Sequence, residues 1–182
     1  MAAESPFGPL PMTVAVQFIA VQLWKRILER IVETCMANVK HIPDGYPAVI
    51  PYLVVQDVEA LVDFLIRVFD AKEGHRSLRP DGTIMHTEVR IGDSVIMMGG
   101  ANEQFKPMPC GLYVYVPDTD VAYKRALQAG ATSLMEPADQ LYGDRNAGVK
   151  DPTGNYWWIG THIDDVSPDE IDKRYAASSG KR

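Results

Sequence analysis

Residues 142–162 read YGDRNAGVKDPTGNYWWIGTH, and this stretch decides the fold. Its middle, residues 151–155 (DPTGN), has turn chemistry, because proline presets φ, glycine tolerates positive φ, and Asp and Asn bond their own backbone. The aromatic and β-branched run that follows, residues 156–159, is typical of a strand. The stretch therefore predicts two strands joined by a tight turn.

Working outward, the hydrophobic pattern predicts two similar halves. In the first half we expect a strand at 48–55, a helix at 56–71, and strands at 73–78, 83–91 and 94–98. In the second half we expect a strand at 111–116, a helix at 118–129, a strand at 133–137 and the two closing strands. Asp57 suits the N-cap of the first helix. The buried stripe of that helix is predicted to be Ala60, Leu61, Phe64, Leu65 and Val68.

The two halves form an internal repeat. Residues 52–57 (YLVVQD) align with 113–118 (YVYVPD), and 89–93 align with 149–155 if the second turn carries a two-residue insertion. Each half is then strand-helix-strand-strand-strand. Two such open sheets placed side by side make an incomplete barrel, with the helices outside and a cleft inside. The predicted fold class is α+β, with two βαβββ modules around a cleft.

A strand, a DPxGN turn and a second strand at the end of a βαβββ unit resemble the vicinal-oxygen-chelate superfamily, which contains glyoxalase I, extradiol dioxygenases and bleomycin-resistance proteins. The sequence of residues 36 to about 169, including the motif Tyr142-Gly143-Asp144-Arg145, is similar to that of the PhnB-like branch of the glyoxalase/bleomycin-resistance family. The resemblance implies the glyoxalase/bleomycin-resistance fold and a homodimer.

Metal-dependent members of that superfamily carry one His, Gln or Glu ligand on the first strand and one on the fourth strand of each half. Here the first-strand positions are Ile50 and Gly111, and the fourth-strand positions are Ile96 (or Met97, if the register slips) and Trp158. None of these side chains can bind a metal ion. We therefore expect no metal at the usual site, and Zn, Ni, Fe or Mn only if the site has moved.

Strand alternation predicts which side chains face the cleft. The inward set is Ile50, Tyr52, Val54, Ser94, Ile96, Met98, Gly111, Tyr113, Tyr115, Tyr156, Trp158, Gly160 and His162. An aromatic cleft with a few polar groups is typical of a small-molecule site. The candidate ligand-binding residues are Tyr52, Tyr113, Tyr115, Tyr142, Arg145, Trp158 and His162. The alternative is that these aromatic side chains belong to the core or to a dimer interface.

A polar strip, His86, Glu88 and Arg90, alternates with apolar residues on the third strand and faces the cleft or solvent. His86 and Glu88 are candidate catalytic residues for acid–base work. They are also candidate ligands, with His162, of a displaced metal site. The opposing interpretation is that His86 is an ordinary hydrogen-bonded histidine. We interpret Asp144 and Arg145 as a solvated strand end or an ion pair.

Composition narrows the class of protein. The 182 residues carry a net charge of −6 and no basic run interleaved with aromatics, which argues against nucleic acid as the partner. Cys35 and Cys110 have no metal-ligand spacing and indicate reduced thiols and a cytoplasmic location. Lys25-Arg26 interrupt the apolar run near the N-terminus, so we expect no membrane span. No basic region precedes that run, which argues against a signal peptide.

We expect three regions along the chain. Residues 1–46 are an N-terminal extension, with residues 12–35 helical beyond a disordered start. We hypothesise that Met36 is the true start, because the sequence from there resembles the family's opening. Residues 47–163 are the glyoxalase/bleomycin-resistance-like domain, with modules at 47–99 and 110–163. Residues 164–182 are a tail that begins as a short capped helix.

Two functions remain open at this stage. The first is a protein that binds a small aromatic or amphipathic molecule in its cleft without the usual metal site. The second is an enzyme. It is either a metal-dependent lyase, isomerase or dioxygenase-type enzyme with a metal site relocated to His86, Glu88 and His162, or a lyase or isomerase that uses those groups for acid–base work. The missing metal ligands favour binding, and the polar strip keeps the enzyme open.

Overall fold

The computed structural model describes residues 22–30, 32 and 39–179. The chain divides into two compact units, residues 1–45 and 46–182. In the first unit, residues 22–30 and 32 are helical, within the segment where the sequence predicts a helix, and the remainder of that segment and Met36 lie outside the described residues. No helix among the described residues is long and apolar enough to cross a membrane.

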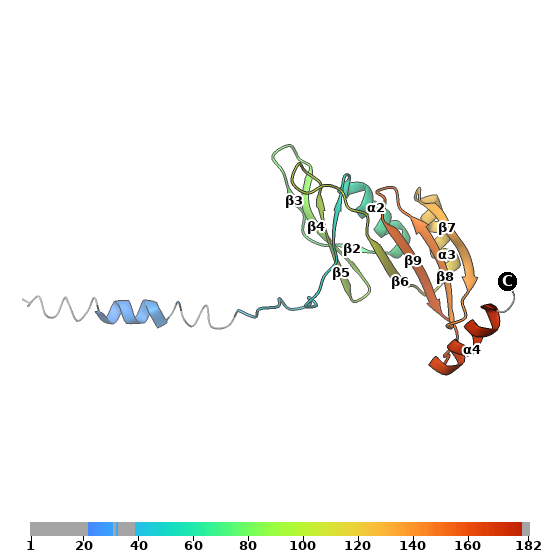
Figure 1. The fold of residues 1–182 in the computed structure, drawn as a ribbon. Coiled ribbons are helices and arrows are strands. Elements are labelled where there is room, and N and C mark those ends of the chain that lie inside the picture. Colours follow the sequence, from blue (N-terminus) through green and yellow to red (C-terminus); the bar gives the residue numbers. More distant parts are fainter. Residues whose placement is uncertain (1–21, 31, 33–38, 180–182) are drawn as a thin grey trace, which may run out of the picture. The chain divides into compact units, whose positions relative to one another are not determined.

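The second unit contains the two predicted modules, each with its own sheet (Figure 1). The first module comprises β1 (Tyr52–Val55), α2 (Val58–Phe69), β2 (Lys72–Glu73), β3 (Ser77–Leu78), β4 (Ile84–Ile91) and β5 (Ser94–Gly100). The second comprises β6 (Gly111–Tyr115), α3 (Thr119–Gln128), β7 (Thr132–Asp139), β8 (Asp144–Lys150) and β9 (Tyr156–His162), and α4 (Pro168–Ser179) follows. The α+β class and the two βαβββ modules are confirmed, without a closed barrel.

Strand order is the same in both sheets. The first sheet runs β1-β5-β4-β2, with β3 also on β4, and the second runs β6-β9-β8-β7. In each sheet the first strand pairs in parallel with the last, and the remaining neighbours are antiparallel. The internal repeat found in the sequence is therefore a repeat of topology.

Both crossover helices begin at an aspartate. Asp57 Oδ1 accepts the Ala60 amide at 3.0 Å, as predicted, and Asp118 Oδ1 accepts the Val121 amide at 3.0 Å. These bonds satisfy amides that have no partner within the helix. The predicted stripe of α2 is buried, except that Ala60 is only partly covered.

One hydrophobic core joins the two modules. α2 and α3 pack against each other on the same side of the two sheets (Figure 1). Phe64 and Phe69 of α2 contact Trp157 of β9, with ring centroids 6.4 and 5.3 Å apart. Trp157 is fully buried. Because the largest core side chain of the second module packs on the helix of the first, each module depends on the other for its core.

The DPTGN turn is held by one buried carboxylate. Asp151 Oδ1 accepts the Thr153 amide at 2.7 Å, the Thr153 hydroxyl at 2.8 Å and the Asn155 amide at 3.1 Å. Asp151 Oδ2 accepts Asn155 Nδ2 at 3.0 Å and Trp157 Nε1 at 2.8 Å. Gly154 adopts φ 102°, where a side chain would be strained. The turn therefore also fixes the core tryptophan.

Two element boundaries differ from the prediction. β1 begins at Tyr52 rather than at 48, because Pro47 and Pro51 lack the amide that a ladder needs. The single strand predicted at 73–78 is split into β2 and β3. Gly74 lies between them, and a Cβ there would meet Glu88 Cγ at 2.9 Å.

The register of β5 also differs from the prediction. Tyr52 is paired with Met97, as Tyr113 is paired with Trp158, so Met97 faces the cleft side. Ile96 and Met98, predicted to face inward, lie instead in the core. The alignment of the two halves placed a two-residue insertion in the turn of the second half. In the structure four residues lie between the paired Arg90 and Val95, and five lie between the paired Lys150 and Tyr156, so the insertion is one residue.

Candidate functional site

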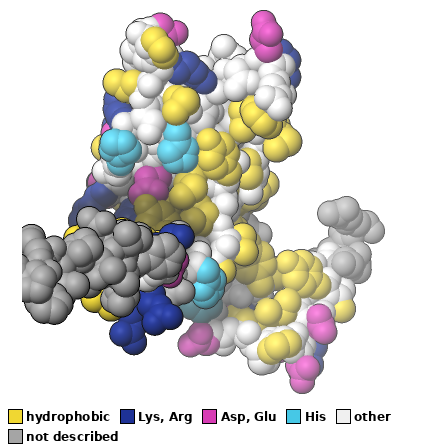
Figure 2. All heavy atoms as spheres, turned by 90° about the vertical axis from the view of Figure 1, so that its left-hand side faces the viewer, with side chains coloured by type: hydrophobic (Ala, Val, Ile, Leu, Met, Phe, Trp, Pro, Cys, Tyr) yellow, Lys and Arg dark blue, Asp and Glu magenta, His cyan; other side chains and the backbone are white. Residues whose placement is uncertain are grey.

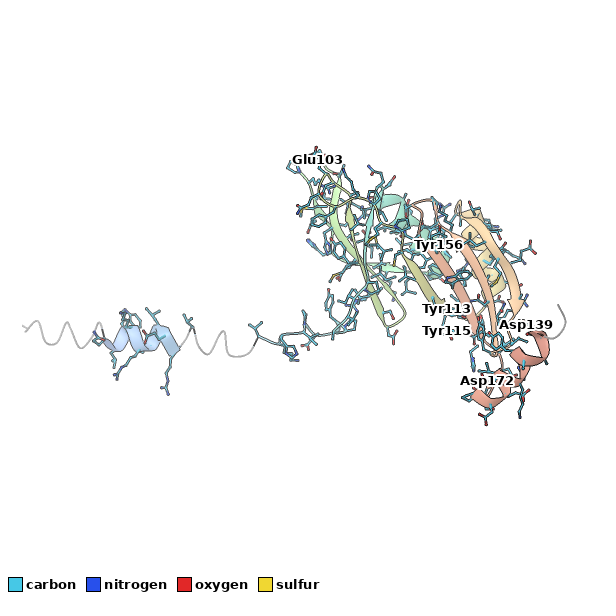
Figure 3. The ribbon with its side chains drawn as sticks, in the orientation of Figure 1. Glu103, Tyr113, Tyr115, Asp139, Tyr156 and Asp172 are labelled. Carbon is cyan, nitrogen blue, oxygen red and sulfur yellow. The ribbon has the colours of Figure 1, made fainter. Side chains whose placement is uncertain are left out.

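Large aromatic side chains are exposed on the sheet faces turned away from α2 and α3. Figure 2 shows hydrophobic side chains gathered over the middle of one face of the molecule. Exposed fractions lie between 38% and 65% for Tyr52, Tyr113, Tyr115, Tyr156 and Trp158. Figure 3 shows Tyr113 and Tyr115 together near one end of β6 and Tyr156 near the other end of the same sheet. Their alternation with buried neighbours on β1 and β9, and with partly buried neighbours on β6, confirms the predicted side of these strands.

A groove borders this face. It has a volume of about 580 Å³ and runs between β6 and the turn from β4 to β5. Its lining includes Val49, Ile96, Leu112 and Tyr113. Among the residues that the structure describes, β6 pairs with β9 alone, and its other edge faces this groove. The groove can admit a ligand of a few rings beside the tyrosines.

The first sheet carries the predicted polar strip. Tyr52 Oη lies 3.2 Å from His86 Nδ1, and the two rings stack with centroids 5.6 Å apart. Glu88 Oε1 accepts the Tyr46 hydroxyl at 2.6 Å, and the Arg90 guanidinium lies over the Tyr46 ring at 5.1 Å. His86 and Glu88 thus have separate tyrosine partners on the same sheet face.

The second sheet brings together three predicted ligand-binding residues, Tyr113, Tyr115 and His162, around one carboxylate. Asp144 Oδ2 accepts the hydroxyls of Tyr113 and Tyr115, each at 2.9 Å. Asp144 Oδ1 lies 2.8 Å from Nδ1 of His162. Burial raises the pKa of the Tyr142 phenol, and the nearby Tyr113 opposes that rise. Only 4% of the Asp144 side chain is exposed, against 53% for His162.

Burial and hydrogen bonding oppose each other at Asp144. Burial raises the pKa of its carboxyl, but hydrogen bonds from His162, Tyr113 and Tyr115 outweigh burial and hold the pKa below its usual value. The hydrogen bond to Asp165, at 2.9 Å from Nε2, and the bond to Asp144 raise the pKa of His162. Burial and the bond to Asp144 raise the pKa of Tyr113. The cluster therefore holds an ionised aspartate beside neutral phenols.

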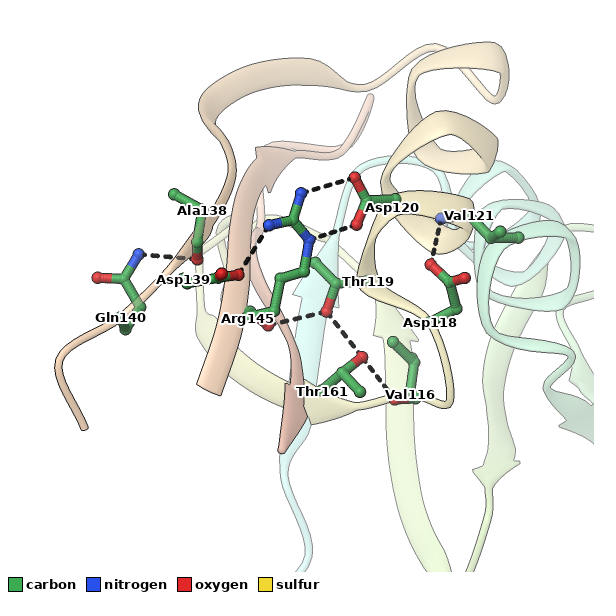
Figure 4. A network of polar contacts seen from close by, with 10 residues as sticks. All are labelled: Val116, Asp118, Thr119, Asp120, Val121, Ala138, Asp139, Gln140, Arg145 and Thr161. Carbon is green, nitrogen blue, oxygen red and sulfur yellow. Dashed lines mark hydrogen bonds and ion pairs between the residues drawn. The ribbon is translucent and has the colours of Figure 1, made fainter. Parts of the chain in front are cut away.

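Arg145 lies on the other side of the sheet (Figure 4). Its guanidinium makes a two-bond ion pair with Asp120 of α3, with Nη2 2.9 Å from Oδ1, and Nη1 lies 2.8 Å from Asp139. These contacts tie β8 to the first turn of α3. The structure thus separates Arg145 from the tyrosine cluster, and its geometry matches the ion pair that the sequence also allowed.

Glycines allow the aromatic rings to lie on the second sheet. A Cβ at Gly148 would meet Trp158 Cζ3 at 2.5 Å, so the indole rests directly on the backbone of β8. A Cβ at Gly160 would overlap the phenol of Tyr113. Both positions require glycine, because any larger residue would displace the aromatic ring that lies on it.

Asp144 is the centre of the cluster, although the sequence predicted it to be a solvated strand end or part of an ion pair. It sits at the start of β8, where an aspartate is ordinarily a solvated strand end. The signal was alternation along β8, which places Asp144, Asn146 and Gly148 on the face shared with Trp158. Tyr52 lies on the first sheet and Trp158 contacts Gly148, so neither joins the cluster directly.

The usual metal positions do not fit a metal ion. In the observed register they are Ile50, Gly111, Met97 and Trp158, none of which offers a nitrogen, thiolate or carboxylate ligand. Across the part of the chain that the structure describes, no group of three or more His, Cys, Asp or Glu could hold a metal ion. His86 and Glu88 lie on the first sheet and His162 on the second, so one chain does not assemble the displaced site.

Comparison with known proteins gives the family. Residues 39–159 match the model of the Glyoxalase/Bleomycin resistance protein/Dioxygenase superfamily. The chain belongs to this superfamily. A relative, the uncharacterized protein Mb0911c of Mycobacterium bovis, is 38% identical over 136 residues, covering 69% of this chain and 90% of that protein.

Two solved structures are similar to this chain in fold. TioX from Micromonospora sp. ML1 is 26% identical with a TM-score of 0.56, covering 64% of this chain and 99% of that one. A PhnB protein from Bacillus cereus is 16% identical with a TM-score of 0.52, covering 63% of this chain and 99% of that one. At this identity the second likeness concerns the fold alone.

Proposed function

We propose that this protein binds a small aromatic or amphipathic molecule on the aromatic face of its second sheet, without a metal at the usual superfamily position. The observation that carries the proposal is the exposure of Tyr113, Tyr115, Tyr156 and Trp158 on one sheet face beside a groove. Exposed large aromatics gathered in this way mark a binding surface rather than a core.

The chemistry of this face selects the ligand class. Trp158 lies on Gly148 with 38% of its surface exposed, which leaves its ring available for stacking. Lys150 Nζ lies over the Tyr156 ring at 5.7 Å, and the tyrosine hydroxyls meet Asp144 at the opposite end. A ligand with a planar apolar body and a polar end matches this arrangement.

We also propose a branch of the family, a cellular location and an oligomeric state. We place the chain in the PhnB-like branch because it has the YGDR motif at residues 142–145 and its fold is similar to that of the Bacillus cereus PhnB protein. We propose a cytoplasmic homodimer, because an aromatic face of this extent gains stability when a second copy covers part of it. Nucleic acid and membranes are not proposed partners, given the net charge of −6.

The test is a binding titration of the full chain. Three aromatic probes of different charge are used: anilinonaphthalene sulfonate, ethidium and the neutral ketone para-biphenylylacetone. Binding is followed by calorimetry and by the rise in melting temperature, since a ligand at a hundred times its Kd stabilises by about 2.7 kcal/mol. Trp158→Ala is expected to weaken binding about tenfold, since stacking is worth about 0.5–1.5 kcal/mol beyond area burial.

The matched control is Trp24→Ala, the same change at an exposed tryptophan of the first unit. It should leave binding unchanged. Equal affinity in the wild type and Trp158→Ala would contradict the proposal. If the aromatics serve only a dimer interface, Trp158→Ala would change the mass measured by light scattering and no probe would bind.

A further inference from the structure

A buried carboxylate orients a half-exposed histidine at one end of the second sheet. Asp144 Oδ1 lies 2.8 Å from His162 Nδ1, so the ring's Nε2 points away from the buried aspartate. Nε2 contacts Asp165 Oδ1 at 2.9 Å. The Asp165 side chain is fully exposed, so a bound molecule can displace it without losing buried contacts.

We propose that Asp144 and His162 form an acid–base pair that moves a proton on the ligand bound to the aromatic face. The inference rests on the proposed binding function and adds a reaction to it. His162 is the catalytic residue, because its Nε2 would touch the ligand. Asp144 is a positioning residue, because it acts through the imidazole ring.

The neighbours of His162 limit the chemistry to proton transfer. Within the described residues, the hydrogen-bond partners of its ring are two carboxylates, Asp144 and Asp165, and no serine, threonine or cysteine. An activated nucleophile requires such a hydroxyl or thiol within hydrogen-bond reach of the base. The pair therefore has a base and an orienting group but no protein nucleophile, which fits proton abstraction from the ligand itself.

The tyrosines keep Asp144 from taking the proton. Tyr113 and Tyr115 both donate to Oδ2, which leaves Oδ1 for the imidazole. Because these bonds favour the ionised carboxylate, the proton taken from a ligand stays on His162. The two phenol rings have centroids 5.0 Å apart, and that of Tyr113 lies over Gly160, between Trp158 and His162 on β9.

The spacing along β9 sets the size of the substrate. Trp158, Gly160 and His162 share one face of the strand, and four residues span about 13 Å at roughly 3.3 Å each. A molecule stacked on Trp158 must pass Tyr113, which lies over Gly160, before it reaches Nε2. We assign the substrate class as elongated aromatic ketones of two or three rings with an acidic C–H beside the carbonyl.

The step balances without another reactant. Neutral His162 takes a proton from the carbon beside the carbonyl through Nε2, and the electron pair of that C–H bond moves to give an enolate. The imidazolium then returns a proton to a carbon of the enolate. Nothing is oxidised or reduced, and the net result is isomerisation or exchange of hydrogen with solvent.

The pH dependence follows from the groups that face His162. Asp144 of β8 and Asp165 before α4 contact its ring directly. The phenols of Tyr113 and Tyr115 donate to Asp144, and Arg174 of α4 pairs with Asp164, the neighbour of Asp165 in the chain. Because the two aspartates favour the imidazolium, the rate should rise with pH around a midpoint above the usual histidine value of about 6.5.

The experiment follows deuterium uptake into the CH₂ group of para-biphenylylacetone by NMR in D₂O, with binding measured on the same samples. We expect the full chain to exceed the buffer rate about a hundredfold. His162→Gln should return to the buffer rate and still bind the ketone. The matched control, His75→Gln, changes an exposed histidine of the first module and should keep the wild-type rate.

Asp144→Asn separates positioning from folding. A positioning role predicts a lower rate and a pH midpoint shifted down toward 6.5, in protein whose circular dichroism is unchanged. Ketone binding without exchange above buffer, or equal exchange in His162→Gln, would overturn the acid–base pair and leave the binding function standing. Absence of ketone binding, together with silence of the other two probes, would contradict both.

Discussion

Asp151→Asn should be the most destabilising single-atom change in the second module. The side chain is 4% exposed and accepts five hydrogen bonds, three on Oδ1 and two on Oδ2. An asparagine keeps one accepting oxygen. If that oxygen replaces Oδ1, its amide group faces the two donors Asn155 Nδ2 and Trp157 Nε1; if it is flipped, three donors lose their acceptor.

The expected loss follows from the better orientation. Two hydrogen bonds to a charged acceptor are lost, each worth about 1.5–3 kcal/mol, and both donors belong to fully buried residues. We expect the free energy of unfolding to fall by about 3–5 kcal/mol. For a chain of this size the melting temperature should fall by about 10 °C.

Urea unfolding followed by circular dichroism measures this loss. Asp93→Asn is the matched control: it makes the same change of one charge at the exposed β4–β5 turn, where Asp93 Oδ1 accepts the Ser94 hydroxyl at 3.1 Å. It should change stability by less than about 0.5 kcal/mol. In a Trp157→Phe background, Asp151→Asn should cost less, because one of the two donors is already gone. A loss below about 1 kcal/mol for Asp151→Asn would refute the reasoning.

Three further predictions concern the site. The pKa of His162 is raised in the folded protein, so its contacts with Asp144 and Asp165 stabilise the fold below about pH 6.5, and this stabilisation is lost as the pH rises through the pKa of the folded state. The melting temperatures of His162→Gln and the wild type should therefore differ more at pH 5.5 than at pH 8.5. An equal difference at the two pH values would contradict this. Arg145→Lys should lower the melting temperature, because it breaks the two-bond pair with Asp120, and leave the affinity for para-biphenylylacetone unchanged; weaker ketone binding would return Arg145 to the ligand site. Incubation with Zn, Ni, Fe or Mn should leave no stoichiometric metal by elemental analysis and no thermal shift; bound metal that disappears in His86→Ala would instead indicate a relocated site.

Local patterns were enough to predict the elements and the repeat. The DPTGN turn, the Asp57 N-cap and the alternation on β6 and β9 are all set by neighbours within a few residues. The register of β5 was not, because it depends on pairing with β1, and Tyr52 lies 45 positions from Met97. Aligning the repeats on their turns misplaced Ile96 and Met98 by one position, which reverses the face of every side chain in a strand.

In the site, too, local pattern predicted some features, and others depend on tertiary packing. Alternation identified Tyr113, Tyr115 and His162 as neighbours on one face. It could not identify Asp144 as their shared partner, because burial of a carboxylate depends on tertiary packing. Arg145 follows Asp144 directly, yet the two residues serve opposite faces of β8, one toward the tyrosines and one toward α3.

The paired tyrosine and glycine of each sheet bear on how the two halves have diverged. In the first sheet the hydroxyl of Tyr52 lies over Gly99, as that of Tyr113 lies over Gly160 in the second. The duplicated halves thus retain the same seat for a phenol, while the adjacent positions hold Met97 in one and Trp158 in the other. The strand beneath these positions differs as well, because Gly148 pairs with Trp158 whereas Glu88 pairs with Met97. A second stacking platform in the first half would therefore need a glycine at 88 together with Met97→Trp, and the missing glycine confines the platform to one half of the repeat.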